Sequence, residues 1–273
     1  MTDSSSELYA TPLDVRNLDQ CWFYHTTNLP GFGMVKGDWD LRAGINDYLG
    51  HVSFAGKRVL DVGTASGFLC FHAEKAGADV IAYDLAPHMQ WDVVPFGGGV
   101  ADSDSAERFH SITSINNSFW LSHRAMASKA RMVHGSIYSI PAEIGPVDIC
   151  LFGSILLHLR DPFLALQNGC RLTKETVVVT DCYRPGLMMR ALDKFGLASD
   201  RMKTAGAPIN QFLPDFRKQS PKDTWWYLSP ALVVEYLGVL GFGDATVTFH
   251  AQPHRGTMSR LYTVVARRTM AMQ

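Results

Sequence analysis

The stretch VLDVGTASG at residues 59–67 joins a short apolar run to a turn that is bounded by glycines. The apolar residues predict a buried strand, and the segment that follows, Phe68–Ala76, has the spacing of a helix. Gly63 and Gly67 allow the backbone to approach a ligand where a side chain would intrude. The first turn of the helix offers free N–H groups and the positive end of its dipole. We therefore expect a strand, a ligand-contacting turn and a helix in succession.

An acidic residue ends the next apolar run, DVIAYD at Asp79–Asp84. A carboxylate in this position can accept hydrogen bonds from both hydroxyls of a ribose. Ligands of parallel sheets bind beside the carboxyl ends of the strands, so Asp84 and the glycine turn are expected to face one crevice. The turn lacks the pattern G-x-G-x-x-G, so a pyrophosphate fits poorly. Asp61 can neutralise an ammonium group beside the turn, which favours a nucleoside with a short amino-acid tail.

Strands and helices continue to alternate along the chain, which predicts an α/β fold with a doubly wound, mostly parallel sheet. The further expected elements are helices at Ser114–Lys129 and Asp161–Arg171 and strands at Arg131–His134, Val147–Phe152 and Thr176–Asp181. Two later strands, Ala245–Phe249 and Leu261–Ala266, are joined by a connection too short for a parallel crossover. We expect them to form an antiparallel hairpin at one edge of a seven-stranded sheet.

The start of the chain predicts a separate helical cap. Apolar residues within Pro12–Thr26 have amphipathic spacing, and Asp38–Leu49 follows as a second expected helix. We therefore divide the chain into a helical leader at 1–52 and a ligand-binding domain at 53–273. Two long stretches without a clear pattern, 85–113 and the insert 183–226, are expected to be lids or binding inserts.

Composition excludes several classes of protein. The chain has 273 residues, 47 % hydrophobic and 19 % charged, which is ordinary for a globular protein and wrong for a disordered one. No apolar run approaches the roughly 20 residues that a membrane span needs, and Met1–Glu7 is polar, unlike a signal peptide. The net charge of -1 gives no global attraction to nucleic acid. The five cysteines are never spaced as C-x-x-C, which favours reduced thiols in the cytoplasm.

The glycine turn and the acid after it resemble the class I S-adenosylmethionine-dependent methyltransferases, whose first motif matches VLDVGTASG. The resemblance covers roughly residues 57–181 and the two terminal strands, and it implies a Rossmann-like fold with S-adenosylmethionine as cofactor. It implies that Gly63 and Gly67 line the methionine end, that Asp84 holds the ribose, and that Ser136 and Ile137 lie beside the adenine. That family often has an acidic residue where Ser136 stands. The full set of expected cofactor contacts is Asp61, Gly63, Thr64, Ala65, Gly67, Asp84, Leu85, Ser136 and Ile137, with Trp39 and Arg42 from the leader.

A narrower resemblance concerns the leader and two later segments. The leader is similar to that of the tRNA wobble-uridine carboxymethyltransferases in three segments: WFYH at 22–25, LPG at 29–31 and GDWDLR at 37–42. Two later segments of the chain also resemble segments of that group, namely LLHLRDP at 156–162 and WYLSP at 226–230. In that group the leader packs over the cofactor crevice. Leu157 replaces the tyrosine that helps to hold an extra carboxylate there, and a buried carboxylate without a donor is costly. This departure favours plain methyl transfer, and the neutral charge disfavours a tRNA substrate.

Four residues are candidates for contact with the acceptor. Methyl transfer is an in-line displacement that depends on positioning, and a hydroxyl acceptor also benefits from a general base. His158 follows a strand at the expected acceptor edge, although it could instead be bonded to the backbone at a helix start. His25 and Tyr24 of the leader could face the same crevice or only pack. Asp181 ends a strand on this edge, where aspartates are often capping groups.

The sequence gives little support for a metal site. His250 and His254 are four residues apart, but Pro253 intervenes and no helical H-E-x-x-H pattern is present. His88 and Asp92 share the spacing in a loop. We therefore expect no metal ion.

Together these features predict a methyltransferase that acts on an oxygen or nitrogen of a small polar acceptor, such as a sugar, a glycoside or a natural product. No membrane partner is expected, and a nucleic acid partner is disfavoured. Two alternatives stay open: a tRNA-modifying methyl or carboxymethyl transferase of the same fold, and a non-catalytic domain that binds the cofactor. Arg42 could pair with the cofactor carboxylate or form a surface ion pair.

Overall fold

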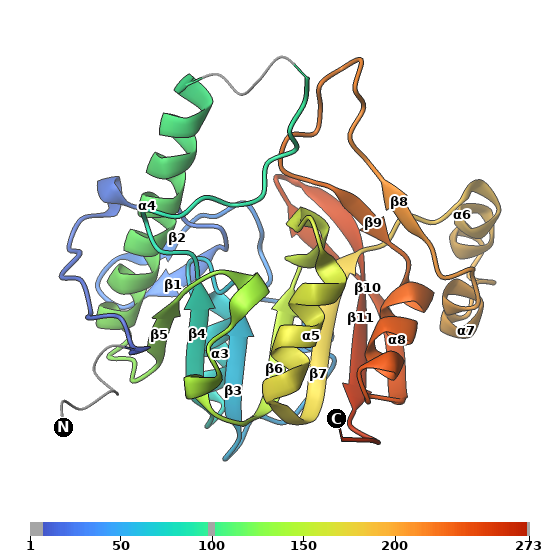
Figure 1. The fold of residues 1–273 in the computed structure, drawn as a ribbon, viewed down its shortest axis with the longest axis horizontal. Helices are drawn as coiled ribbons and strands as arrows, with labels where there is room; N and C mark the ends of the chain where they lie inside the picture. The colour runs from blue at the N-terminus through green and yellow to red at the C-terminus, as the bar shows by residue number, and fades with distance from the viewer. Residues whose placement is uncertain (1–7, 98–101, 272–273) are drawn as a thin grey trace.

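The computed structural model describes residues 8–97 and 102–271, so Met1–Glu7 and positions 98–101 of the expected loop at 85–113 lie outside the described residues. A central sheet has the strand order β10-β11-β7-β6-β3-β4-β5 (Figure 1). Its strands are β3 (Arg58–Val62), β4 (Asp79–Asp84), β5 (Arg131–His134), β6 (Val147–Gly153), β7 (Thr173–Cys182), β10 (Asp244–His254) and β11 (Thr257–Arg267). The predicted seven-stranded Rossmann-like sheet is therefore confirmed.

Strand direction determines where a site can lie. The five strands β3 to β7 run parallel, and in this register Asp84 at the end of β4 lies beside His134 at the end of β5. Strand β11 pairs antiparallel with both β7 and β10, which confirms the predicted hairpin at the sheet edge. The carboxyl ends of the parallel strands therefore share one edge, the position at which such sheets bind ligands.

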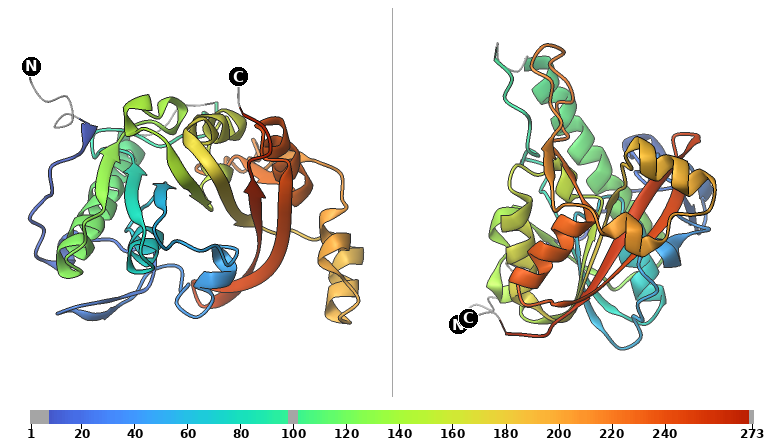
Figure 2. Two further views of the ribbon diagram at one scale, coloured as in Figure 1. Left: turned by 90° about the horizontal axis from the view of Figure 1, so that it is seen from below. Right: turned by 90° about the vertical axis from the view of Figure 1, so that its right-hand side faces the viewer.

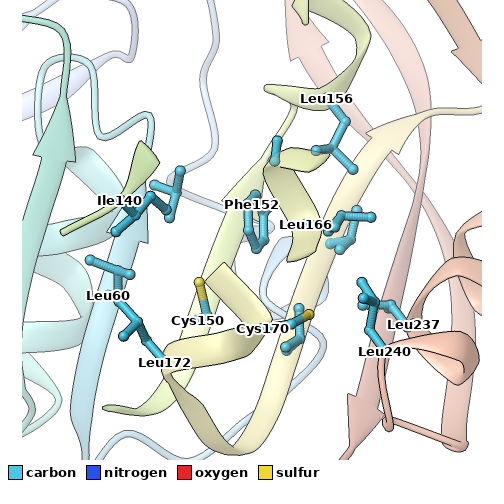
Figure 3. Packing of buried hydrophobic residues seen from close by; sticks show 14 of the residues in the cluster. Leu60, Ile140, Cys150, Phe152, Leu156, Leu166, Cys170, Leu172, Leu237 and Leu240 are labelled. Carbon is cyan, nitrogen blue, oxygen red and sulfur yellow. The ribbon is translucent and has the colours of Figure 1, made fainter. Parts of the chain in front are cut away.

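Different helices cover the two faces of the sheet (Figure 2). One core cluster joins the sheet to α5 (Pro162–Leu172) and α8 (Pro230–Val239), as Figure 3 shows. The other joins it to α3 (Phe68–Lys75), α4 (Asp102–Ala125) and the leader. Neighbouring residues of one strand enter different clusters because side chains alternate across a sheet. Caps fix both helices of the first face, since Asp161 and Ser229 accept N–H groups of their first turns and a proline follows each.

The leader is not the helical cap that the sequence predicts. Pro12–Thr26 contains only the short 3₁₀ helix η1 (Leu18–Gln20), and Asp38–Leu49 only α2 (Ile45–Tyr48). Between them lies the antiparallel pair β1 (Thr27–Leu29) and β2 (Gly33–Val35). The amphipathic spacing misleads here because its apolar residues do not share a buried face: Leu13, Leu18 and Trp22 are exposed, whereas Val15 and Phe23 are buried.

The two long irregular stretches hold more secondary structure than predicted. Helix α4 begins at Asp102 rather than at Ser114. The insert contains α6 (Leu187–Lys194), α7 (Asp200–Thr204) and β8 (Asn210–Phe212), and β8 pairs with β9 (Trp226–Leu228). Short 3₁₀ helices follow β5 and β6, namely η2 (Ile137–Ser139), η3 (Ala142–Ile144) and η4 (Leu156–His158). No helix within the described ranges has the length and apolar character needed to cross a membrane.

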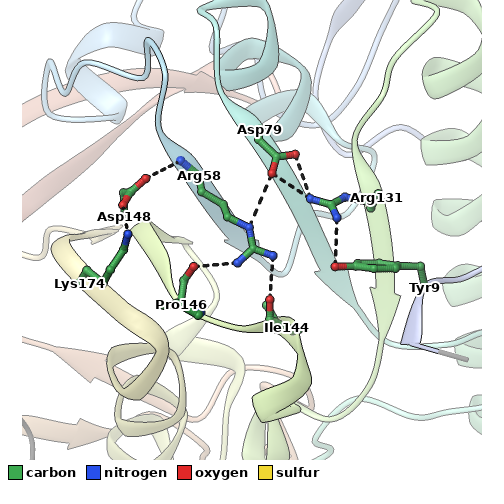
Figure 4. A network of polar contacts seen from close by, with 8 residues as sticks. All are labelled: Tyr9, Arg58, Asp79, Arg131, Ile144, Pro146, Asp148 and Lys174. Carbon is green, nitrogen blue, oxygen red and sulfur yellow. Dashed lines mark hydrogen bonds and ion pairs between the residues drawn. The ribbon is translucent and has the colours of Figure 1, made fainter. Parts of the chain in front are cut away.

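A polar network occupies the amino edge of the sheet (Figure 4). Asp79 at the start of β4 pairs with Arg131 of β5 at 2.9 Å and with Arg58 of β3 at 3.6 Å. The Arg58 guanidinium also donates to the carbonyls of Ile144 and Pro146. The charges of this network are paired with one another.

Candidate functional site

The glycine turn at the end of β3 has the backbone that the sequence predicts. Gly63, Ala65 and Gly67 have φ values of 75°, 50° and 86°, which favour glycine over other residues. A Cβ on Gly67 would lie 2.3 Å from the ring of Phe71, and one on Gly63 would lie 3.1 Å from Ile155. The packing of α3 is therefore one reason for glycine at position 67, beside the ligand contact that the sequence predicts.

Asp84, at the end of β4, is hydrogen-bonded to the glycine turn that follows β3. One carboxylate oxygen accepts the N–H of Ala65 at 2.7 Å, and the other accepts the N–H of Leu85 at 2.7 Å. Burial raises the pKa of Asp84, and these backbone hydrogen bonds oppose the rise. A carboxylate has about four lone-pair sites, so about two remain for further donors.

Asp61 is a buried acid on β3 with one unused oxygen. Thr64 donates a hydrogen bond of 2.7 Å to Oδ2, while Oδ1 has no partner in the described part of the chain. Burial raises the pKa of Asp61 to about 7, and the hydroxyl of Thr64 offsets part of that rise. A cationic group beside Oδ1 would favour the ionised form.

The expected adenine side lies after β5. The Ser136 hydroxyl accepts the N–H of Tyr138 at 3.3 Å, and its carbonyl accepts the Tyr83 hydroxyl at 2.8 Å. Ser136 is thus engaged in capping η2, where Ile137 is the first residue. The sequence analysis missed Asn116 of α4, which is buried and donates to the carbonyl of Leu85 at 3.2 Å. A polar residue within the buried pattern of a helix was the signal for it.

The leader contacts the start of α3. The His25 ring stacks on Phe68 with 5.5 Å between ring centroids, and desolvation lowers the pKa of His25 to about 3. Its Nδ1 has no partner among the residues that the structure describes. Burial also raises the pKa of Tyr24. His25 therefore lies beside the start of α3 and Tyr24 packs edge-on against His25, both as neutral groups.

Trp39 and Arg42, the other leader candidates, have contacts within the leader and the β10–β11 hairpin. Trp39 donates its backbone N–H to Tyr24 at 3.0 Å and stacks its ring on His254 at 4.2 Å. Arg42 forms an ion pair of 2.8 Å with Asp40, and its side chain is 37 % exposed. For Arg42 this is the surface ion pair that the sequence left as an alternative.

His158 lies in η4, just after β6. Its Nδ1 contacts the carbonyl of Asp223, which can only accept, so Nδ1 carries the proton. The backbone bond that we considered for this residue is therefore present. In the neutral ring the lone pair is then on Nε2, which has no hydrogen-bond partner within residues 8–97 and 102–271. This tautomer is the one that can accept a proton at Nε2.

Asp181 ends β7 and is 2 % exposed. Its Oδ1 accepts the N–H of Cys182 at 2.6 Å, whereas Oδ2 has no partner within the described ranges. Burial raises the pKa of Asp181 to about 7, and the backbone of Cys182 and the charge of Arg184 oppose the rise. Nearby, Tyr48 shares a hydrogen bond of 2.9 Å with Ser154, and its pKa is raised by burial.

Buried polar atoms without partners gather around the carboxyl edge. Leaving such an atom unpaired costs about 1–3 kcal/mol, so natural proteins hold few of them. The atoms of this kind near the turn, the strand ends and the helices beside them are His25 Nδ1, Asp61 Oδ1, Ser66 Oγ, Asn116 Oδ1, His134 Nδ1 and Asp181 Oδ2. These atoms of the described residues are the ones at this edge that could hydrogen-bond a polar ligand.

The loop after β4 and the loop before β9 lie above this edge and are hydrogen-bonded to each other (Figure 1). Val94 donates its backbone N–H to the carbonyl of Lys222 at 2.9 Å, and the Trp225 indole donates to the carbonyl of Asp92 at 3.4 Å. Trp225 also donates its backbone N–H to Leu157, next to His158. The loop before β9 therefore contacts His158 directly, and the loop after β4 is bonded to the loop before β9.

The histidines that invited a metal interpretation are engaged elsewhere. His250 hydrogen-bonds Thr263 at 2.9 Å and Gln252 at 3.2 Å. No group of three or more histidine, cysteine, aspartate or glutamate side chains in the described residues could hold a metal ion.

Comparison with known proteins identifies the fold. No protein-family model matches the chain, and no curated protein matches its sequence. The crystal structure of the N-terminal domain of EvdMO1 in the presence of SAH and D-fucose is similar over 92 % of each chain, with a TM-score of 0.55 and 14 % identity. The SAH-bound structure of the same domain gives a TM-score of 0.52 at 14 % identity, again over 92 % of each chain. This chain therefore has the Rossmann-like fold of those structures.

Proposed function

We propose that the chain is an S-adenosylmethionine-dependent methyltransferase that transfers a methyl group to an oxygen or nitrogen of a small polar acceptor. The observation that carries this proposal is the hydrogen bond from the Ala65 N–H in the glycine turn to Asp84. Asp61 Oδ1, which has no partner in the described residues, belongs to the strand that leads into this turn. These groups lie at the edge where parallel sheets bind nucleosides. The fold of an SAH-bound domain supports the same cofactor class.

The residues present fit this cofactor. The two free acceptor sites of Asp84 suit the two hydroxyls of a ribose. Asp61 Oδ1 suits the ammonium group of the methionine portion, and Ser66 Oγ lies in the same turn with no partner in the described chain. When bound, the cofactor supplies an activated methyl group on a sulfonium. The turn and the two acids position that group at the carboxyl edge.

The acceptor side is proposed to involve His158, Asp181 and the leader. A hydroxyl that attacks a methyl group loses a proton, and His158 Nε2 has the lone pair to take it. Asp181 Oδ2, which has no partner in the described residues, would accept a hydrogen bond from the acceptor. Tyr24 and His25 would then exclude water from this side. The D-fucose that accompanies SAH in the EvdMO1 structure supports a sugar hydroxyl as the acceptor.

Two observations favour methyl transfer over carboxymethyl transfer. Leu157 is buried and apolar where a carboxylate donor would be needed, and Arg42 is already paired with Asp40. A buried carboxylate without a donor is costly. A cytoplasmic location belongs to the same proposal, and it is supported by the absence of disulfides, since all five cysteines are free thiols.

Transfer of a labelled methyl group tests the proposal. The protein is incubated with methyl-labelled S-adenosylmethionine and either D-fucose or a fractionated metabolite extract, and label in the products is measured. The proposal expects labelled small molecules and none in added tRNA. Binding of SAH without any labelled product would instead identify a non-catalytic domain, and labelled tRNA would identify the modifying enzyme.

A further inference from the structure

Asn116 lies on the buried side of α4 and has one unused hydrogen-bonding atom. Its side chain is 4 % exposed. The amide nitrogen donates to the carbonyl of Leu85 at 3.2 Å and to that of Ile112 at 3.0 Å. The amide oxygen, Oδ1, has no partner in the part of the chain that the structure describes.

These two bonds fix the orientation of the carboxamide. Both neighbours are backbone carbonyls, which only accept, so the NH₂ group must face them. A flipped amide would place its oxygen against two acceptors and lose both bonds. Oδ1 is therefore held in place as an acceptor that needs a donor.

The position of Asn116 relates it to the nucleoside. It holds the carbonyl of Leu85, which directly follows the proposed ribose acid Asp84. A nucleobase is attached to the same sugar and must lie near this segment. On the other expected side of the base, the Ser136 hydroxyl is already engaged by Tyr138. Position 136 has a hydroxyl and no carboxylate, so an acceptor from a neighbouring element is a candidate for contact with the edge of the base.

We propose that Asn116 Oδ1 accepts a hydrogen bond from the exocyclic amino group of adenine. This inference rests on the proposed function and adds a specificity-determining residue to it. The chain would select a 6-aminopurine over a 6-oxopurine, because a carbonyl facing Oδ1 leaves two acceptors together. If Asn116 only held the carbonyl of Leu85 in place, the chain would not distinguish a 6-aminopurine from a 6-oxopurine in this way.

Calorimetric titration with two ligands tests this inference. SAH carries the amino group, and S-inosylhomocysteine carries a carbonyl in its place. The wild type is expected to bind SAH about 5- to 150-fold more tightly, the usual effect of leaving one buried polar group unpaired. Asn116→Ala should bind both ligands within about threefold of each other. Asn117→Ala is the matched control, since Asn117 also donates to a carbonyl, that of Gln20 at 2.9 Å, and should keep the wild-type preference.

The outcomes separate this inference from the proposed function. A wild type that binds both ligands equally, or an Asn116→Ala protein that keeps the preference, overturns the inference alone. Loss of preference in His134→Ala with preference kept in Asn116→Ala also overturns it. If Asn116→Ala fails to fold, Asn116→Ser serves as the second variant with the same expected loss, and the wild-type comparison needs no variant. A wild type that binds neither ligand overturns the proposed function and this inference with it.

Discussion

Replacing Asp84 with asparagine removes the charge at the end of β4 while keeping the shape of the side chain. In the folded chain the carboxylate accepts two backbone N–H groups, those of Ala65 and Leu85, each at 2.7 Å. About two of its lone-pair sites remain for a ribose. Asparagine keeps one oxygen, and its amide nitrogen cannot accept a hydrogen bond from either backbone group.

The expected loss of affinity follows from the strength of these bonds. A hydrogen bond to a charged group contributes about 1.5–3 kcal/mol, against about 0.5–1.5 kcal/mol for a neutral pair. Each of two bonds to the ribose hydroxyls therefore weakens by about 1–1.5 kcal/mol, which gives about 2–3 kcal/mol in total. The dissociation constant of SAH should rise by about 30- to 150-fold.

Isothermal titration calorimetry with SAH at pH 8 measures this loss. Asp79→Asn is the matched control, because Asp79 lies at the other end of the same strand and pairs with Arg131 on the surface at 2.9 Å. Surface pairs contribute about 0–1 kcal/mol to stability and do not touch the ligand, so this variant should bind SAH like the wild type. Equal affinities of the two variants would refute the assignment of the ribose to Asp84.

Three further changes test other parts of the structure. His158→Ala should lower turnover by about 10²- to 10⁴-fold while the calorimetric affinity for SAH stays unchanged, and equal losses in both would show that the histidine is only structural. Asp181 has a pKa of about 7 in the folded wild type, so between pH 5 and 7 the folded chain holds a proton that the unfolded chain has released. The wild type therefore loses stability as the pH rises over this interval, whereas the Asp181→Asn variant does not lose stability in this way. The difference in the free energy of unfolding, measured in urea, should grow by about 2–3 kcal/mol over this interval, and a constant difference would contradict the raised pKa. Gly67→Ala should destabilise the chain by several times the loss in Gly31→Ala, because both have positive φ but only Gly67 would place a Cβ 2.3 Å from Phe71. Equal urea midpoints for these two glycine variants would exclude the packing explanation.

Strands β3 to β6 could be predicted because they are short apolar runs with clear ends, whereas β7, β10 and β11 extend beyond their predicted bounds by up to five residues at one end. β4 and β5 have the bounds that the sequence indicates, and β3 and β6 differ by a residue or so. The edge hairpin was predicted because a short connection permits only antiparallel pairing. Such features are local, and tertiary contacts do not change them.

The leader could not be predicted because its structure depends on partners that are distant in the sequence. Trp22 hydrogen-bonds its backbone to Ser114 of α4 at 3.1 Å, and Ser118 returns a bond to its carbonyl at 2.7 Å. These contacts hold the segment extended, although its apolar spacing is typical of a helix. Contacts of this kind override local helical propensity.

The candidate site was predictable in part for a similar reason. Asp61 and Asp84 were found because strand ends and glycine turns can be read from the sequence. Asn116 was missed because its importance comes from a helix that packs beside Leu85, which lies 31 positions away along the chain. The bond from His158 to Asp223 joins residues 65 positions apart, so its tautomer could not be deduced from either segment alone.

A crystal structure of the protein with SAH bound would show whether the cofactor lies at the glycine turn. We expect the ribose hydroxyls within hydrogen-bond distance of Asp84 and the amino-acid portion beside Asp61. SAH bound at another place, or residues 63–67 that stay free of SAH at saturating concentration, would overturn the proposed site.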